Sequence, residues 1–181
     1  TLHEGTVVLN GANTFTGEVQ VAMGTLSISD DSNLGDVTNP ILFNVLSDVL
    51  NAPFDVTTGT LAVTSTTTIN ALRTIDIANT TGDTAVFQIS SGATATVDGI
   101  ISGTAEGTLQ KTGAGTLVLT GANDYTGFTL ISAGTLQLSG AGTVGVDTGV
   151  TVESSGTFDL NGVAATIGSL AGSGSVTLGG A

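Results

Sequence analysis

The residues best suited to chemistry form an acidic run near the N-terminus, Asp30-Asp31-Ser32-Asn33-Leu34-Gly35-Asp36. Carboxylate and amide oxygens around a glycine are typical of calcium loops. The EF-hand template needs a bidentate Glu at its twelfth position, where this chain has Ile41, and the nonapeptide of calcium β-rolls is also missing. Because Asp and Asn readily bond their own backbone in turns, the run favours a structural turn and leaves calcium binding open.

Catalytic residues are not expected. The sole histidine, His3, stands beside Glu4, and the chain has no Gly-x-Ser-x-Gly elbow that would give it a nucleophile partner. Only Arg73 and Lys111 could supply a cationic base for carboxylate-assisted sugar chemistry. The carboxylates are scattered, at Asp76, Asp83, Asp98, Asp124, Asp147 and Asp159. The sequence therefore predicts no enzyme and no catalytic, cofactor-binding or metal-binding residue, with a polysaccharide-acting enzyme as an alternative.

The amino-acid composition limits the classes of partner that the chain is expected to bind. The 181 residues include two basic and fifteen acidic side chains, for a net charge of −13. A phosphate backbone needs clustered Lys and Arg, so nucleic acid is not expected as a partner, and neither is a polybasic membrane contact. The apolar runs are too short for a membrane-spanning helix, which predicts no direct membrane insertion. The chain has no cysteine, so no disulfide bond can stabilise its fold.

Short β-rich runs bracketed by Gly, Asn, Asp and Ser fill the chain, a pattern typical of strands and turns. Gly-Thr-aliphatic steps begin at Gly5 and Gly24, and they recur with the same spacing at Gly115 and Gly134. A recurrence of about 20 residues is the length of one turn of a β-solenoid. We therefore predict an all-β parallel β-helix of about eight or nine coils, with Ile41–Leu50 as a further strand and an antiparallel sandwich as the competing fold.

The chain also contains a longer repeat, since residues 5–29 and 115–139 align without gaps at an offset of 110. Phe15 and Tyr125 occupy the same repeat position, which favours an aromatic that packs a corner over one used in adhesion. The glycines of the repeat, at Gly17, Gly24, Gly127 and Gly134, are expected at corners, some of them with positive φ. The repeat thus predicts that one backbone shape is built twice.

Residues 115–127 and 134–138 resemble the passenger-associated strand repeat of bacterial autotransporters, and residues 99–120 and 156–181 resemble its flanks. The resemblance implies a right-handed parallel β-helix carried to the surface of Gram-negative cells by type V secretion. It also implies that 1–181 is a single β-helical passenger segment, a fragment that lacks the signal and the translocator of a full-length member.

From these observations we expect a structural stalk or display segment of an adhesin-like protein at the cell surface or outside the cell, with a host or cell-surface ligand. A self-assembling subunit that forms filaments through its exposed solenoid ends is the alternative. A third interpretation is ice binding by a flat threonine ladder. That interpretation needs regular Thr-x-Thr rows, and the sequence offers isolated pairs such as Thr66 with Thr68 and Thr94 with Thr96.

Overall fold

The computed structural model describes residues 4–43, 58–77, 83–103, 107–145 and 148–179. These ranges hold sixteen strands, one 3-10 turn, η1 (Asp31–Leu34), and no α-helix. Within them, no helix is long and apolar enough to cross a membrane. The strands are β1 (Thr6–Leu9), β2 (Val19–Gln20), β3 (Gly24–Ile28), β4 (Ile41–Leu42), β5 (Thr58–Val63), β6 (Thr67–Ile69), β7 (Ile75–Asp76), β8 (Thr84–Ile89), β9 (Thr94–Val97), β10 (Ile101–Ser102), β11 (Thr108–Thr112), β12 (Thr116–Leu119), β13 (Phe128–Leu138), β14 (Gly149–Asp159), β15 (Ser169–Gly172) and β16 (Ser175–Thr177).

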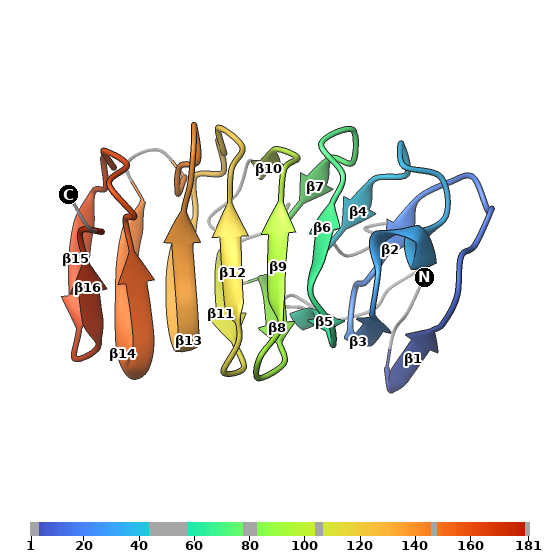
Figure 1. Cartoon of the computed structure of the whole chain (residues 1–181), viewed down its shortest axis with the longest axis horizontal. Coiled ribbons are helices and arrows are strands. Elements are labelled where there is room, and N and C mark those ends of the chain that lie inside the picture. The colour runs from blue at the N-terminus through green and yellow to red at the C-terminus, as the bar shows by residue number, and fades with distance from the viewer. Residues whose placement is uncertain (1–3, 44–57, 78–82, 104–106, 146–147, 180–181) are drawn as a thin grey trace, which may run out of the picture.

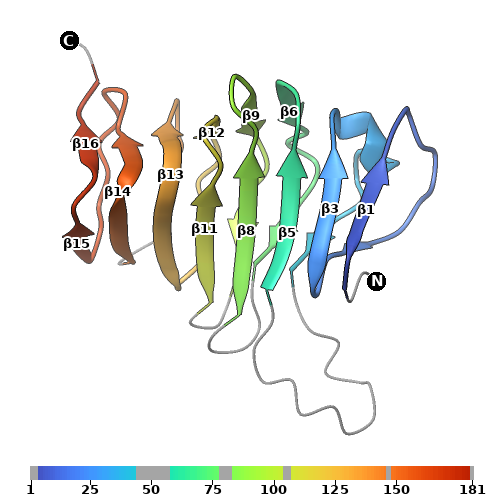
Figure 2. The ribbon, with the colours of Figure 1, turned by 90° about the horizontal axis from the view of Figure 1, so that it is seen from below.

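The strands stack in parallel into a solenoid, as Figures 1 and 2 show. The first face runs β1-β3-β5-β8-β11-β13 and continues through β14 to β15. The second runs β6-β9-β12-β13 and continues through β14 to β16, while β2, β4, β7 and β10 form the third. The long strands β13 and β14 belong to both of the first two faces, and their pairing shifts register between Ile131 and Ala133. The prediction of an all-β parallel solenoid is confirmed, and the antiparallel sandwich is wrong.

The solenoid has about seven turns, fewer than the eight or nine predicted. The shortfall arises because several coils are longer than the repeat. The first coil leads from Thr6 to its partner Thr25, whereas the next is much longer and leads from Gly24 to Gly59. Of the predicted strand Ile41–Leu50, the first two residues form β4, and residues 44–50 lie outside the described residues.

The interior is filled by ladders of side chains that repeat once per coil. One ladder runs through Leu26, Leu61 and Phe87 and, after Lys111, continues through Ile131 and Val152. The apolar members are 5% exposed or less, and burial of each such side chain stabilises the fold by about 1.5–3 kcal/mol. Lys111 is therefore the one charged side chain in an otherwise apolar ladder.

The two copies of the repeat lie on different faces. Thr6 stacks through Thr25, Thr60 and Val86 to Gln110, four coils away on the first face. Its sequence equivalent Thr116 follows Gln110 in the chain but lies in β12, on the second face. The second copy is thus displaced from the first by four turns and one face.

The glycines of the two copies reflect this displacement. Gly24 and Gly134 both have positive φ, of 85° and 67°, and Gly17 has a φ of 141°, as predicted for some of these positions. Gly127, the equivalent of Gly17, does not have positive φ. A Cβ at Gly127 would instead collide with the backbone carbonyl of Gly107 in the preceding coil. The same repeat position therefore serves a turn in one copy and a close backbone approach in the other.

Candidate functional site: the acidic corner around Arg73

The acidic run forms a corner built on η1. The Asp30 carboxylate accepts hydrogen bonds from the Ser32 backbone N–H at 3.0 Å and the Ser32 hydroxyl at 2.6 Å. Asn33 completes a capping box with Asp30, and Gly35 ends the turn with a φ of 74°. An Asp at the N-cap and a Gly at the end are the residues that such a short helical turn requires.

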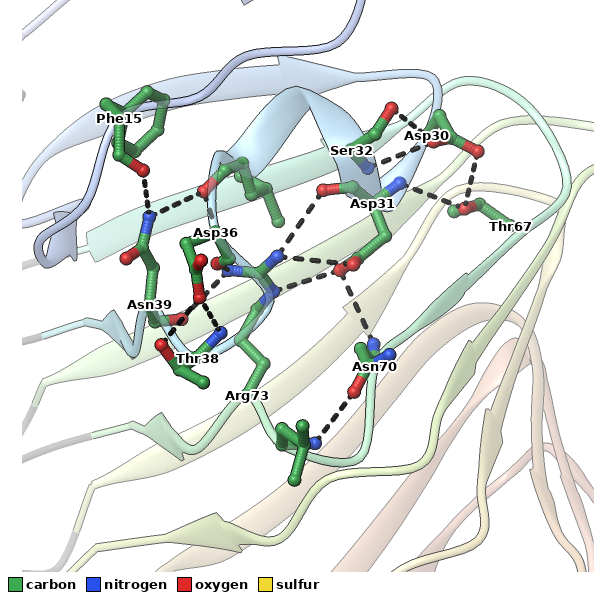
Figure 3. Close-up of polar contacts among 12 residues, drawn as sticks. Phe15, Asp30, Asp31, Ser32, Asp36, Thr38, Asn39, Thr67, Asn70 and Arg73 are labelled. Atoms are coloured by element: carbon green, nitrogen blue, oxygen red, sulfur yellow. Dashed lines mark hydrogen bonds and ion pairs between the residues drawn. The ribbon is translucent and has the colours of Figure 1, made fainter.

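Arg73 enters this corner from the coil that follows β6, and its side chain is fully buried. Its Nε and Nη2 lie 2.9 and 3.2 Å from the two carboxylate oxygens of Asp31, a bidentate ion pair. Its Nη1 donates to the backbone carbonyls of Asp36 at 3.0 Å and Asn39 at 2.9 Å. Figure 3 shows the guanidinium at the centre of these oxygens.

This geometry accounts for the composition of the acidic run. The Asp31 carboxylate and the loop carbonyls bond an internal cation, the guanidinium. The other two carboxylates turn to local hydroxyls, Asp30 to Ser32 and Asp36 to Thr38. These hydrogen bonds lower the pKa of Asp30 and of Asp36. Among the described residues, no three His, Cys, Asp or Glu side chains are grouped so that they could hold a metal.

Asparagine side chains fasten the same corner to the first coil. Asn39 Oδ1 accepts from the Gly17 N–H at 2.8 Å, and its Nδ2 donates to the Phe15 carbonyl at 3.0 Å. Asn33 Nδ2 donates to the Gly11 carbonyl at 2.8 Å, and Asn13 Nδ2 donates to the Asn33 carbonyl at 2.8 Å. These amides satisfy backbone groups that the irregular corner leaves without strand partners.

Lys111, the second cation of the chain, is also fully buried. Its ammonium donates to the carbonyls of Thr112 and Gly113, both at 2.8 Å, and of Ala133 at 3.0 Å. Burial lowers the pKa of Lys111 to about 8. Neither of the two cations that the sequence offers as a base is therefore open to a substrate.

Phe15 and Tyr125, the aromatic residues at the same repeat position, differ in their burial. Tyr125 is fully buried, and its hydroxyl lies 2.7 Å from that of Thr129, which confirms the predicted packing role at this position. Burial raises the pKa of Tyr125. Phe15 is 40% exposed, contrary to that prediction, although its ring lies close to Gly35 of the following coil.

The remaining candidates do not gather into a site. His3 and Asp147 lie outside the described residues. Asp83 is buried, whereas Asp98 and Asp124 are exposed. Asp159 bonds Gln137 at 2.7 Å and Thr177 at 2.9 Å across the second face, and these hydrogen bonds, led by that from Gln137, lower its pKa. The sequence offers Arg73 and Lys111 only as possible bases, and no local pattern in it indicates that Arg73 would pair with Asp31.

The fold and these contacts define a parallel β-solenoid whose polar side chains bond from coil to coil, and comparisons with known proteins identify its family. The passenger-associated-transport-repeat family matches residues 4–28 and 106–138. The chain is 35% identical over 147 residues to the adhesin BmaC autotransporter of Brucella suis biovar 1 (strain 1330), a match that covers 79% of this chain and 4% of the adhesin. No solved structure matches it significantly. The chain is a segment of an autotransporter passenger with passenger-associated repeats, which confirms the resemblance drawn from its sequence.

Proposed function

We propose that residues 1–181 act as one display segment of a surface-exposed, adhesin-like passenger, a scaffold that holds other parts of the protein away from the cell and performs no catalysis. The proposal rests on which groups the polar side chains of the segment bond. Both cations and the asparagines of the repeat bond backbone groups, several of them in neighbouring coils. Groups committed in this way hold a scaffold together and are not free to turn over a substrate.

The geometry of the segment supports the same role. Stacked parallel strands are about 4.8 Å apart, so about seven turns extend the chain by roughly 35 Å. In the described residues, the inward apolar side chains of successive turns form one buried cluster that fills the interior. The matched relative is named an adhesin. Since this chain spans only 4% of that relative, attachment to a host or cell-surface ligand is proposed for the whole passenger.

Deletion of one turn tests the scaffold role. Thr116 pairs with Thr135, so removal of residues 116–134 from the full passenger joins equivalent positions of successive coils. We expect the shortened passenger to reach the cell surface and to keep its adhesion. Removal of residues 116–127 is the matched control, since it breaks the stacking and should abolish display. A one-turn deletion that is displayed but no longer adheres would place the ligand site in these coils and overturn the scaffold role.

Assembly through the solenoid ends stays a prediction. A net charge of −13 makes copies of the chain repel one another at low ionic strength. If end-to-end stacking nevertheless occurs, electron microscopy of the isolated chain should show fibres that lengthen with concentration and with salt. Dispersed short rods at all concentrations would instead leave only the display role.

The threonine ladder is only half formed. Thr94, Thr116, Thr135 and Thr157 stack in one continuous row on the second face. In the neighbouring row Thr68 pairs with Thr96, but the next coils carry Val118, Gln137 and Asp159. Ice binding needs both rows, so this interruption argues against it.

A further inference from the structure

Two Asn-Gly pairs of this chain follow the same residue type, in Leu9-Asn10-Gly11 and Leu160-Asn161-Gly162. An asparagine before a glycine can lose its side-chain amide without an enzyme. The backbone nitrogen of the glycine attacks the side-chain carbonyl, and glycine has no Cβ to hinder that approach. Asparagine is accordingly one of the thermolabile residues. Because the local sequences match, a difference in reactivity between the two pairs must come from the fold.

Hydrogen bonds hold the Asn161 pair in a closed turn. The Val163 N–H donates to the Leu160 carbonyl at 2.7 Å and closes the turn. The Gly162 N–H, which carries the attacking nitrogen, donates to the Leu178 carbonyl of the next coil at 2.8 Å. Because that nitrogen must give up its proton before it attacks, this hydrogen bond has to break first. The fold therefore slows the reaction at Asn161.

The Asn10 pair has no such protection. The pairing of β1 with β3 ends at Leu9 and Ile28, immediately before Asn10. Among the described residues, no acceptor pairs with the Gly11 N–H. Asn10 and Gly11 are both exposed, and a Cβ at Gly11 would have nothing within 4 Å. The attacking nitrogen can therefore lose its proton to the solvent without breaking a hydrogen bond within the described chain.

We propose that Asn10 is a site of spontaneous deamidation in the folded chain, whereas Asn161 is protected. The Gly11 nitrogen gives its proton to hydroxide and forms a bond to Cγ of Asn10. The bond from Cγ to Nδ2 breaks, and Nδ2 takes a proton from water and leaves as ammonia. Water then opens the succinimide ring at either carbonyl, which yields aspartate or isoaspartate at position 10. This reaction belongs to the chain itself and does not depend on the proposed display role.

The product alters the link between the first coil and the acidic corner. Deamidation adds a negative charge, and isoaspartate also lengthens the backbone by a methylene group. The Gly11 carbonyl accepts from Asn33 Nδ2 at 2.8 Å. Asn33 Oδ1 in turn accepts from the N–H groups of Ser29 at 2.9 Å and Asp30 at 3.0 Å. A longer backbone displaces the Gly11 carbonyl from Asn33, so deamidation loosens this corner.

Mass spectrometry of the folded 181-residue chain, aged at mildly alkaline pH, tests the proposal. Cleavage after glutamate yields residues 5–18 as one peptide and 154–181 as another, so each pair is measured separately. We expect Asn10 to convert to aspartate and isoaspartate, and Asn161 to convert about tenfold more slowly, the factor that one retained hydrogen bond can supply. In urea the two rates should become similar, because the local sequences match. Equal rates in the folded chain, or no conversion of Asn10, would overturn the proposal.

N10T is the matched control, since the second copy of the repeat has Thr120 at this position and threonine has no amide to lose. Ageing should accelerate amide hydrogen exchange at Ser29 and Asp30 in the unsubstituted chain and leave it unchanged in N10T. Conversion of Asn10 without faster exchange at Ser29 and Asp30 would show that the modification does not reach the acidic corner, and that step of the proposal would be wrong. Faster exchange in both chains would assign the effect of ageing to another residue and contradict the same step.

Discussion

The hydroxyls of Tyr125 and Thr129 lie 2.7 Å apart in the buried interior, and the other copy of the repeat replaces both residues with apolar ones. Phe15 and Val19 stand at the equivalent positions. The two changes belong together, since loss of one hydroxyl leaves the other buried without this partner. The repeat thus tolerates a polar pair or an apolar pair at this corner.

A double-mutant cycle tests this coupling. Y125F and T129V should each lower the free energy of unfolding by about 1–2 kcal/mol, because each leaves one buried hydroxyl without its partner. The double variant should lose less than the sum of the two, by about 1 kcal/mol. Urea unfolding of the 181-residue chain provides the measurement. Strict additivity would mean that the two hydroxyls do not interact.

Arg73 is expected to be the most sensitive position of the acidic corner. R73M leaves the Asp31 carboxylate and the carbonyls of Asp36 and Asn39 without their donor, which should cost about 3–5 kcal/mol. R73K should recover little of this loss, because an ammonium cannot reproduce the fork that meets both Asp31 oxygens. D36N is the matched control, since Arg73 bonds the Asp36 carbonyl and not its carboxylate, and it should change the free energy of unfolding far less. Equal losses in R73M and D36N, measured by urea unfolding, would contradict the assigned contacts.

The same contacts argue against calcium binding at residues 30–36, which the sequence leaves open. The guanidinium occupies the oxygens that a calcium ion would need, so we expect no saturable heat when calcium is titrated calorimetrically to about millimolar concentration, within the range where weak extracellular calcium sites bind. The D31N variant should behave identically. A one-to-one binding isotherm that D31N abolishes would show that the loop is a metal site.

The acidic corner shows what a single sequence can and cannot predict. The residue types of the run Asp30–Asp36 are compatible with either a turn or an ion site. The decisive group, Arg73, is far from Asp31 in the sequence, in a coil whose length no local pattern determines. The burial of Lys111 could be predicted more easily, because the alternation of a strand places it on the same side of β11 as the buried Leu109.

Buried Lys111 should make stability depend on pH. Its pKa is about 8 in the folded chain and near its ordinary value of 10.5 in the unfolded chain. Between these values the unfolded chain binds more protons, so the free energy of unfolding should rise with pH, by up to about 3 kcal/mol across the window. Unfolding in urea at about pH 7.5 and about pH 9.5 would detect part of this rise, below the raised pKa of Tyr125. In K111M the rise should disappear; persistence of the full slope in K111M would assign it to another group.

The repeat predicted the solenoid correctly, but it did not predict the number of turns or the face of each copy. Coil lengths vary, since Thr6 pairs with Thr25 in the first coil whereas Gly24 pairs with the much more distant Gly59 in the next. Extra residues between paired strands leave the strand pattern unchanged, so a count based on the repeat alone overestimates the turns. The same insertions displace the second copy by one face, because Thr116 follows β11 around a corner.

Asn123 provides the last prediction, since its side chain joins three coils. Its Oδ1 accepts from the Ile101 N–H at 2.8 Å and its Nδ2 donates to the Thr143 carbonyl at 2.6 Å. Asn13, its equivalent in the other copy, donates to the Asn33 carbonyl of the following coil at 2.8 Å. Asn123 is 3% exposed, whereas Asn13 is half-buried.

N123A should therefore lower the free energy of unfolding by about 2–4 kcal/mol, because two backbone groups in neighbouring coils lose their partner, and N13A should lower it by about 1 kcal/mol. Hydrogen exchange should show faster exchange of the Ile101 amide in N123A but not in N13A. Equal losses in the two variants would mean that the preceding coil does not depend on this amide.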